Sequence, residues 1–596
     1  MSRPPLSTPR KLCYAAIATM GLLALGLGGL ELGLHVGGVG HSPHFTRAAV
    51  TATDEPVWRE NRWATAPYFG EHRVRRPWPL RLPREKASET YRIFVLGSSA
   101  AMGDPEPSFS LARVLDSMLT AAYPEIRFEV VNAAITAINS HVVRGIAADA
   151  ARLDPDLFIV YEGHNEVIGP FGPTGVFSRF QRGPLAVRAA DTWQRSRTGQ
   201  WLSGVVDKSP EDDESWRGME MFIAQQIAES DPRLDAVRAH FAANLRAIGG
   251  SAREAGATVL FCTVLTNQRD FAPFMPRHRS DLTAADTAAW ETHYAQADAA
   301  LATGDLRTAD RLYRAAWAID DQHAELAFRL GRLALQRSDP RDATRWLRRA
   351  LELDTLRFRA DGALNEIVRQ VGNEFAAQGG LVDLAAALAR TSPQGIPGDD
   401  LLYEHVHLNF HGTYLAAREL FPRIGADLVE RGWVSRFQGA PFSESEARRR
   451  LGYNAHEQTM IALELVSRFG RAPFTGQSDN AQRLFAWSER ATRGQALLDR
   501  PSTLDALRLG AARSLQLAPG DWVLQRNTGA MLVARGAAAE ALPMLEAAAA
   551  WIDDDVDTLM ALGLAQEATG DTAAATATFA KVRALEPNYP GLSEPL

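Results

Sequence analysis

The sequence predicts an α/β protein: a parallel β-sheet covered by helices on both faces, with a helical repeat pair inserted into it and an all-helical C-terminal region. Two observations lead to this prediction. Short β-rich runs alternate with helical segments in the first half of the chain, as in parallel sheets. From about residue 285 the pattern is helical, and small and large apolar residues recur every 34 residues.

Composition limits the class of protein. Hydrophobic residues make up 46% and charged residues 23% of the 596 residues, which is ordinary for globular proteins and excludes a mostly disordered chain. The mean hydropathy of −0.18 excludes a polytopic membrane protein. The 64 basic and 71 acidic residues give a net charge of −7, so we expect no nucleic-acid partner. The two cysteines, Cys13 and Cys262, form neither a disulfide framework nor a metal-binding pair, and we expect no cofactor.

The N-terminus contains one segment suited to a membrane. Leu12–Leu30 is a run of nineteen residues without a charge, about the length of one bilayer-spanning helix. Arg3, Arg10 and Lys11 precede it, so the positive-inside rule keeps the N-terminus in the cytoplasm and exports the rest. A cleaved signal peptide is the alternative, but such signals have shorter apolar cores of about 7–15 residues. The length therefore favours an uncleaved anchor within residues 1–40.

The α/β region follows a lead-in over residues 41–89. We expect it to occupy residues 90–284 and 355–435, with the repeat pair at 285–354 inserted and a separate helical domain at 440–596. A helix is predicted from about Ser110 to Ala122. The β-rich runs are Arg92–Leu96, Phe128–Asn132, Leu157–Tyr161 and Thr258–Val264, and sheet-like sequence returns at Gly380–Leu384 and from Leu401 to Ala417.

The 34-residue interval links matched positions in two parts of the chain. The pairs are Ala297 and Gly331, Ala309 and Ala343, Tyr313 and Leu347, Ala316 and Ala350, then Gly529 and Gly563, Ala541 and Ala575, Leu545 and Phe579, Asp553 and Pro587. Pro519 hints at a further unit. The pattern resembles tetratricopeptide (TPR) repeats, in which small residues let two helices cross; generic alanine-rich hairpins are the alternative. We expect two hairpins in 285–354, two to three in 500–596, and a protein partner bound by the repeats.

Chemistry-bearing residues follow the strands. Val95–Gly103 places serines directly after a buried strand and a glycine, and Val131–Asn139 is rich in small residues. Tyr161–Glu166 and Tyr403–Gly412 are rich in groups that titrate or form hydrogen bonds. Because loops at the carboxyl ends of parallel strands form the sites of such sheets, we expect these segments to meet.

Together these segments resemble the four sequence blocks of the SGNH/GDSL hydrolases. The resemblance implies a flavodoxin-like three-layer α/β/α fold and a serine hydrolase site. It implies Ser99 as the nucleophile, His407 as the general base and Glu404 as the acid that orients it. It also implies an oxyanion hole made by the N–H groups of Ser99 and Ala137 and the amide of Asn165.

Three positions depart from the family pattern. Ser98 replaces the acidic residue of the first block, Ala137 replaces glycine, and Glu404 replaces aspartate. Ala137 retains the backbone N–H if its backbone conformation is allowed. Glu404 keeps the charge on a side chain that is one methylene longer. None of the departures removes a catalytic group.

Other interpretations of the polar residues remain open. His405, His407 and His411 with Glu404 are an alternative metal cluster, since His-x-His is a plausible zinc pair. His164 and His405 are possible substrate-facing residues. We expect Glu162 and Glu166 to be solvated or to lie just behind the site. Arg357 and Arg359 are either helix-surface cations or contacts to an anionic substrate.

The resulting hypothesis is a membrane-anchored, exported serine esterase that hydrolyses or transfers an acyl group on an O-acylated glycan or lipid. The resemblance extends to a bacterial subgroup that carries TPR repeats, which implies a single-pass protein of the inner membrane with its bulk in the periplasm. The alternative is a non-catalytic TPR scaffold that binds partner proteins at the membrane.

Overall fold

A computed structural model describes residues 8–51, 53–174, 183–206, 217–437, 439, 442–586 and 589. Its centre is a five-stranded parallel sheet with the order β5-β4-β6-β7-β8. The strands are β4 (Thr90–Gly97), β5 (Arg127–Asn132), β6 (Leu157–Tyr161), β7 (Thr258–Cys262) and β8 (Gly379–Val382). In chain order this is the 2-1-3-4-5 arrangement of flavodoxin-like folds. The structure confirms the predicted fold class.

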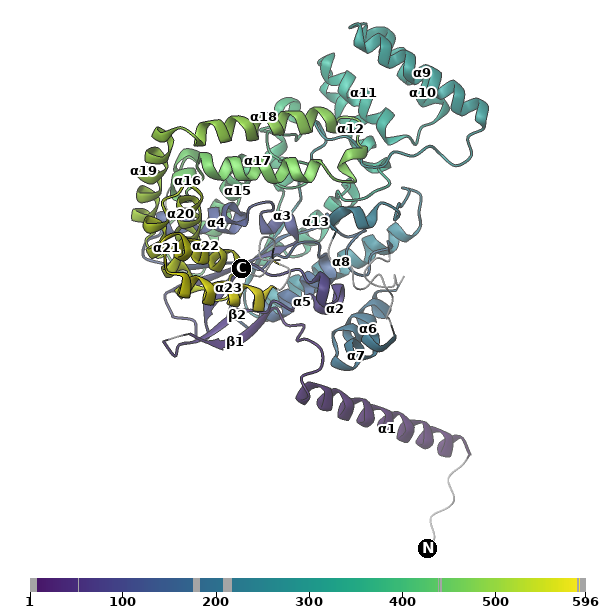
Figure 1. The fold of residues 1–596 in the computed structure, drawn as a ribbon. Helices are drawn as coiled ribbons and strands as arrows, with labels where there is room; N and C mark the ends of the chain where they lie inside the picture. The colour runs from purple at the N-terminus through teal and green to yellow at the C-terminus, as the bar shows by residue number, and fades with distance from the viewer. Residues whose placement is uncertain are drawn as a thin grey trace.

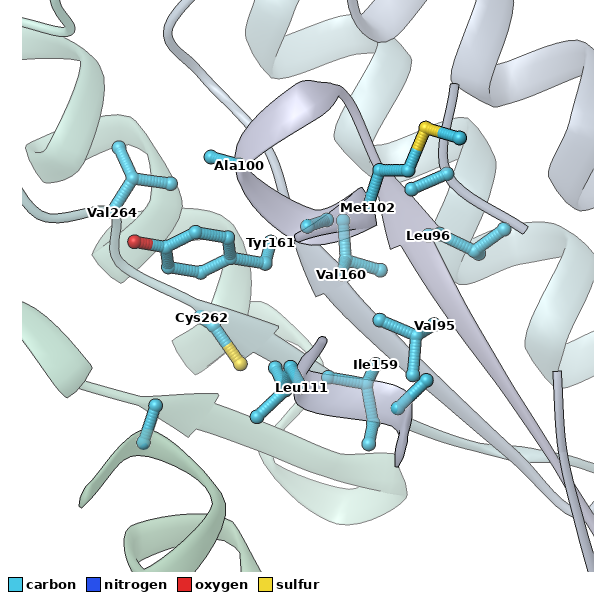
Figure 2. Close-up of a cluster of buried hydrophobic side chains, with 14 of the residues drawn as sticks. Val95, Leu96, Ala100, Met102, Leu111, Ile159, Val160, Tyr161, Cys262 and Val264 are labelled. Carbon is cyan, nitrogen blue, oxygen red and sulfur yellow. The ribbon is translucent and has the colours of Figure 1, made fainter. Parts of the chain in front are cut away.

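The sheet is buried on both faces. Every residue of β4, β6 and β7 is buried, which explains why these strands have continuous apolar runs rather than alternation. Helices α4 (Leu111–Ala122) and α15 (Phe410–Glu430) pack together in one layer. The other layer contains α5 (Ser140–Ala150), α8 (Arg233–Glu254) and α13 (Gly362–Glu374). Figure 2 shows the apolar side chains of β4 and β6 beneath the short helix α3 (Ser99–Met102).

One predicted sheet-like segment is wrong. Leu401–Ala417 forms no strand of the sheet: Leu402 and Leu408 make an isolated bridge, and α15 begins at Phe410. The side chain of Asn409 accepts a hydrogen bond from the N–H of Gly412 and caps this helix. A short apolar run is compatible with either a strand or a buried helix, and here the cap and the packing of α15 select the helix.

The region between β7 and β8 contains the two predicted hairpins. Their helices are α9 (Ala284–Ala302), α10 (Leu306–Ile319), α11 (Ala324–Gln336) and α12 (Pro340–Leu353). A Cβ atom at Gly331 would lie 2.6 Å from the Cγ atom of Leu347, so the two helices cross where the repeat pattern places a glycine. These helices have a hydrophobic core of their own, which includes Ala272 and Ile396 from the α/β region.

The C-terminal region is helical and ends in two more hairpins. Its helices are α16 (Glu444–Arg450), α17 (Ala455–Phe469), α18 (Asn480–Leu498), α19 (Pro501–Leu517), α20 (Trp522–Ala534), α21 (Ala538–Trp551), α22 (Val556–Ala568) and α23 (Thr572–Leu585). Cβ atoms at Gly529 and Gly563 would lie 2.5 Å from Leu545 Cγ and Phe579 Cε1, the same contact as in the insertion. The region is therefore a helical repeat; Pro587, the last matched position, lies outside the described residues.

The expectation of a separate C-terminal domain does not describe its first helices. Apolar residues of α16, α17 and the following loop belong to the same hydrophobic core as the sheet. They are Ala447, Leu451, Ile461, Leu465, Phe469 and Phe474. Amphipathic helices bury their apolar side against the nearest apolar surface. Here α16 contacts α4 and α15, which belong to the α/β region.

The end of the repeats contacts the lead-in. The lead-in holds a three-stranded antiparallel sheet of β1 (Thr46–Val50), β2 (Pro56–Glu60) and β3 (Arg81–Pro83). The short helix α2 (Ala66–Phe69) lies between β2 and β3 in the chain. Arg59 of β2 forms ion pairs with Asp553 and Asp554, and Arg76 pairs with Glu586. In Figure 1, α23 lies next to β2.

The chain begins with a long apolar helix, α1 (Thr8–Val36), which projects from the rest of the molecule (Figure 1). It is the one helix in the described residues that is long and apolar enough to cross a membrane. Arg3, the first of the basic residues used to orient it, lies outside the described residues. Helices α6 (Pro184–Arg195) and α7 (Arg197–Val206) form a hairpin beside it, and α7 contacts α1.

Candidate active site

The loops that follow β4, β5 and β6 meet the loop before α15 at one cavity. The cavity has a volume of about 310 Å³ and is lined by Ser99, Ala137, Asn165 and His407. It lies at the carboxyl ends of the strands, where β4 and β6 are neighbours and the strand order reverses. The structure thus brings together residues that are more than 300 positions apart in the chain.

Ser99 occupies the first position of α3, directly after the turn that ends β4. A Cβ atom at Gly97 would lie 2.7 Å from the Cβ atom of Ala101 and still closer to the carbonyl oxygen of Tyr161, so only glycine fits this turn. The Oγ atom of Ser99 lies 2.8 Å from Nε2 of His407. Ser98 is 1% exposed and is not among the residues that line the cavity. The turn therefore presents Ser99, not Ser98, to the imidazole.

Glu404 is fully buried and holds the other side of the His407 ring. Its Oε1 atom is hydrogen-bonded to Nδ1 of His407, and its Oε2 atom accepts a hydrogen bond of 3.1 Å from the N–H of Val406. Burial raises the pKa of Glu404, but the charges and hydrogen bonds of His405 and His407 outweigh this and hold the pKa well below its usual range. An ionised carboxylate only accepts hydrogen bonds, so the proton of neutral His407 sits on Nδ1 and leaves Nε2 to accept from Ser99.

Two further charged groups adjoin His407. Asp104 Oδ2 lies 3.5 Å from Nδ1 of His407 and forms an ion pair with Arg468 of α17. Arg468 also lies 3.9 Å from Oε1 of Glu404. Burial lowers the pKa of His407, but the negative charges of Glu404 and Asp104 outweigh it and raise this pKa above its ordinary value. Sequence reasoning missed both groups: Asp104 directly follows the first block, whereas no local pattern marks Arg468.

The other two candidate oxyanion donors, Ala137 and Asn165, also line the cavity. Ala137 has φ of 63°, a left-handed conformation at the position where the resembling family has glycine. The amide nitrogen of Asn165 donates one hydrogen bond of 2.9 Å to the carbonyl oxygen of Ile138. Because that amide has two N–H bonds, the second remains for a group in the cavity.

The rest of the cavity wall combines apolar side chains with charged ones, which include Glu464 and four arginines. The apolar side chains are those of Ile168, Met219, Phe222, Phe358 and Phe474, and the arginines are Arg75, Arg217, Arg468 and Arg471. Arg75 donates a hydrogen bond of 2.8 Å to the hydroxyl oxygen of Thr136. Apolar walls with a few converging polar groups are typical of sites for small molecules.

The two histidines expected to face substrate differ in position. His405 lines the cavity, packs against the rings of Phe274 and Phe474, and lies against Oε2 of Glu404. His164 is buried and is not among the residues that line the cavity; its Nδ1 atom accepts a hydrogen bond of 3.3 Å from the N–H of Ala360. Burial, with the nearby histidine charges, lowers the pKa of His164 to about 3, so the ring is neutral.

Of the two alternatives expected for Glu162 and Glu166, the structure excludes the solvated one and leaves a position just behind the site. Glu162 and Glu166 are both buried. Glu166 accepts hydrogen bonds of 2.8 and 2.7 Å from the N–H and hydroxyl groups of Ser140 at the start of α5, and burial raises its pKa to about 7. Glu162 accepts a hydrogen bond of 3.0 Å from the N–H of Gly163 and binds Ser98, beside the candidate nucleophile.

Neither interpretation of Arg357 and Arg359 holds. Both side chains are buried in the segment after α12, so they are not helix-surface cations, and neither lines the cavity. Arg357 donates to the carbonyl oxygen of Ile227, and Arg359 donates to those of Asn267 and Phe271 and pairs with Asp354. They join the base of the inserted repeats to the α/β region. Hydrophobic patterning does not reveal a buried arginine whose partners are carbonyl oxygens.

The alternative metal cluster forms only in part. Potential ligand atoms of Glu404, His405 and His407 lie within 4.8 Å of one another. His411 is not part of this group, because its Nδ1 atom lies 2.7 Å from the carboxylate of Glu444. The same Glu404 and His407 form the hydrogen-bonded chain to Ser99.

A larger hollow of about 560 Å³ lies on the other side of the loop that carries Glu404. It is lined by Tyr403, Tyr453, Trp487 and Arg448, among others. The smaller cavity at Ser99 contains the hydroxyl–imidazole pair, so we take that one as the candidate active site.

No protein-family model matches the sequence, and no curated protein matches it. Solved TPR structures are among the chains that show similarity to it. The TPR protein YrrB, described as having an unusual peptide-binding site, is 13% identical over 51% of this chain and 94% of its own, with a TM-score of 0.13. The TPR2AB domain of yeast Sti1, in a pHSP90 complex, is 13% identical over 52% and 94%, with a TM-score of 0.13. The RpL4 assembly chaperone Acl4 is 15% identical over 48% and 99%, with a TM-score of 0.14. These TM-scores are too low to show a common fold; the helix crossings at Gly331, Gly529 and Gly563 identify the repeats.

Proposed function

We propose that the protein is a serine esterase of the SGNH type that acts on an acyl ester. One observation carries the proposal: Ser99 Oγ lies 2.8 Å from His407 Nε2 in a cavity, with buried Glu404 bonded to the opposite ring nitrogen. A serine hydroxyl is a weak nucleophile until a hydrogen-bonded base takes its proton, and this arrangement supplies one.

In the proposed reaction, the Ser99 oxygen attacks the ester carbonyl while His407 Nε2 takes the hydroxyl proton. Glu404 stabilises the resulting imidazolium and keeps the ring oriented. The N–H groups of Ser99 and Ala137 and the amide of Asn165 bind the negative oxygen of the tetrahedral intermediate. The intermediate collapses to an acyl-serine as His407 returns the proton to the leaving alcohol. Water, or a second alcohol, then releases the acyl group by the reverse sequence.

The cavity favours an acyl group of modest size. Ile168, Met219 and Phe222 form an apolar wall next to Ser99, and the volume of about 310 Å³ is at the small end for ligand sites. An O-acylated glycan or a lipid ester places such a group in the cavity and leaves its alcohol part outside. Both substrate classes belong to the proposal.

A fluorophosphonate probe tests the nucleophile. We expect the full-length protein to be labelled and Ser99→Ala to lose both labelling and ester hydrolysis, with His407→Ala losing activity to a similar extent. Asn165→Ala is expected to lower kcat about 10²–10³-fold with little change in KM. Ser98→Ala is the matched control and retains labelling. Labelling that persists in Ser99→Ala, or activity that a chelator abolishes, would contradict the proposal.

We further propose that α1 is an uncleaved anchor in a bacterial inner membrane and that the rest of the chain lies on the exported side. The support is the apolar helix of 29 residues, with Arg10 and Lys11 ahead of its charge-free run. Reporter fusions after Gly40 and at the C-terminus should both report the exported side, and intact-mass measurement should find the N-terminus retained. A mature protein that starts near residue 40 would show a cleaved signal instead.

A second role, binding of a partner protein, is favoured by the inserted hairpins. Trp317 of α10 and Trp346 of α12 line a surface hollow of about 460 Å³ together with Arg345, Arg348 and Arg349. Tryptophan and arginine are enriched where proteins bind one another. This role is compatible with the esterase and does not depend on Ser99. Trp317→Ala should weaken recovery of a partner and leave esterase activity unchanged.

A further inference from the structure

The hairpin of α6 and α7 exposes large apolar side chains beside α1. Leu185 is 79% exposed and Val205 57%, and Trp193, Trp201 and Leu202 are exposed as well. Trp193 and Trp201 are the exposed tryptophans of the described residues. On α6, Leu185 and Trp193 are eight residues apart and share one helix face. An isolated exposed apolar residue is common, but such a concentration marks an interaction surface.

The opposite face of α6 is fixed to the α/β region. Val187 and Asp191 of α6 are buried. Asp191 accepts hydrogen bonds of 2.8 Å from the hydroxyl of Tyr68 and 2.6 Å from the guanidinium of Arg144. Asp191 is also the one acidic residue of the sequence 184–205, so the exposed face of the hairpin carries no carboxylate.

Hydrogen bonds also join the hairpin to the end of α1. Glu31 is the first charged residue after the apolar run, and its carboxylate accepts hydrogen bonds of 2.7 and 2.8 Å from the N–H groups of Arg197 and Thr198 at the start of α7. The Arg197 side chain donates to the carbonyl oxygen of Val39, and Gln200 bonds both backbone groups of His41. The start of α7 is thus held at the level where the charge-free part of α1 ends.

We propose that α6 and α7 lie in the interfacial layer of the membrane that α1 crosses, on its exported side; this rests on the proposed anchor. At about 1.5 Å per residue, the 29 residues of α1 extend about 43 Å, more than the roughly 30 Å of a hydrocarbon layer. Glu31 therefore lies at the edge of that layer, and it brings α7 to the same depth (Figure 1). Tryptophan concentrates at this depth in membranes, and an acid-free face with Arg188 exposed suits phosphate headgroups.

The hairpin also has a place in the site. In the sequence the hairpin lies between Ile168 and Met219, and both residues line the cavity. Because Asp191 fixes α6 to Tyr68 and Arg144 of the α/β region, docking of the hairpin holds the candidate active site at a set distance from the lipid surface. This orientation favours acyl esters carried by lipids or by molecules anchored in the same leaflet.

Spin-label depth measurement tests the docking on the full-length protein in vesicles of phosphatidylethanolamine and phosphatidylglycerol. Cys13→Ala provides the background, since Cys262 is buried. Leu185→Cys and Val205→Cys carry the labels, and Phe485→Cys and Leu509→Cys are the matched controls, being 67% and 55% exposed on α18 and α19. We expect labels at 185 and 205 to be more accessible to oxygen than to a water-soluble nickel chelate. The control labels should be more accessible to the chelate.

Two results would overturn the proposal. Labels at 185 and 205 that contact nickel as freely as the controls would place the hairpin in water. Labels shielded from both oxygen and nickel would show that a protein, or a second copy of this chain, covers the surface. A label at Met20→Cys in α1 separates these failures from failure of the anchor itself, because it reports the bilayer centre only if α1 crosses the membrane.

Discussion

Ala137 illustrates how a single backbone conformation bears on the candidate site. Its φ of 63° lies in the left-handed region, which disfavours residues with a Cβ atom by about 1–2 kcal/mol. Glycine adopts this conformation without that penalty but loses roughly 0.5–1 kcal/mol more in chain entropy on folding. We therefore expect Ala137→Gly to raise the free energy of unfolding by up to about 1 kcal/mol and to leave esterase activity intact, because the N–H is unchanged.

Denaturant unfolding measures this difference. Ala133→Gly is the matched control, since Ala133 is buried in the same connection and is not in a left-handed conformation. This control should lower stability. Equal losses in the two variants would show that Ala137 is not strained.

Asp104 and Arg468 set the charge around His407 with opposite signs. Asp104 raises the pKa of His407 and Arg468 lowers it. Under the proposed mechanism His407 acts unprotonated, so kcat/KM rises with pH through a pKa above the ordinary histidine value. Asp104→Asn removes a negative charge and should move this acid limb to lower pH. Arg468→Gln removes a positive charge and should move it to higher pH.

The pH–rate profile of kcat/KM is the measurement for this pair. A purely structural role of the ion pair would lower the rate at every pH in both variants without moving the limb. Limbs that move in the same direction would contradict the charge argument. Thermal unfolding of both variants at neutral pH controls for loss of fold.

At the scale of elements, the helix crossings of three hairpins depend on a glycine, at Gly331, Gly529 and Gly563; Ala297 occupies this position in the first hairpin. Gly529 of α20 faces Leu545 of α21, and an added Cβ atom would lie 2.5 Å from Leu545 Cγ. Gly510 of α19 has no atom within 4 Å of the same built position. We expect Gly529→Ala to destabilise the protein by about 1–3 kcal/mol through overpacking. Gly510→Ala should stabilise it by up to about 1 kcal/mol, because alanine is the better helix former.

Thermal unfolding measures the difference in stability between the two variants. The double variant Gly529→Ala, Leu545→Ala tests whether crowding against Leu545 causes the loss of stability. Relief of the crowding should return part of the lost stability. A double variant whose loss of stability equals the sum of the two single losses would show that Gly529 acts for another reason.

At the scale of the whole molecule, the two helical regions relate differently to the sheet. The insertion α9–α12 has its own core, whereas α16 and α17 share the core of the sheet, and α17 carries Arg468 to the cavity. We expect replacement of Ala284–Leu353 by a flexible linker to preserve fluorophosphonate labelling of Ser99. Truncation after Gly439 should abolish labelling, because it exposes apolar residues of the core and removes Arg468 and Phe474.

Truncation after Asp555 provides a matched control for the loss of helices as such. It removes α22 and α23 but keeps the ion pairs of Arg59 with Asp553 and Asp554. This variant should retain labelling. Labelling that survives truncation after Gly439 would show that the α/β region is complete without the C-terminal helices.

The sequence by itself determined the class of fold and the repeats, and its resemblance to the four SGNH/GDSL blocks implied the grouping of Ser99, Asn165 and His407. These features leave local signals: a buried strand that ends in glycine and serine, and a fixed interval between the helix crossings. Such patterns report which face of an element is buried and where the element ends. They do not report which distant elements meet.

Only the tertiary structure decided the rest. Arg468 and Asp104 are 364 positions apart, and nothing in the sequence near either one points to the other. Three other features have the same origin. They are the buried hydrogen bonds of Arg357 and Arg359 to carbonyl oxygens, the start of α15 inside a predicted strand, and the core that α16 and α17 share with the sheet. Each depends on long-range packing, which overrides local preference because burial and ion pairing act between elements that are adjacent in space and remote in the chain.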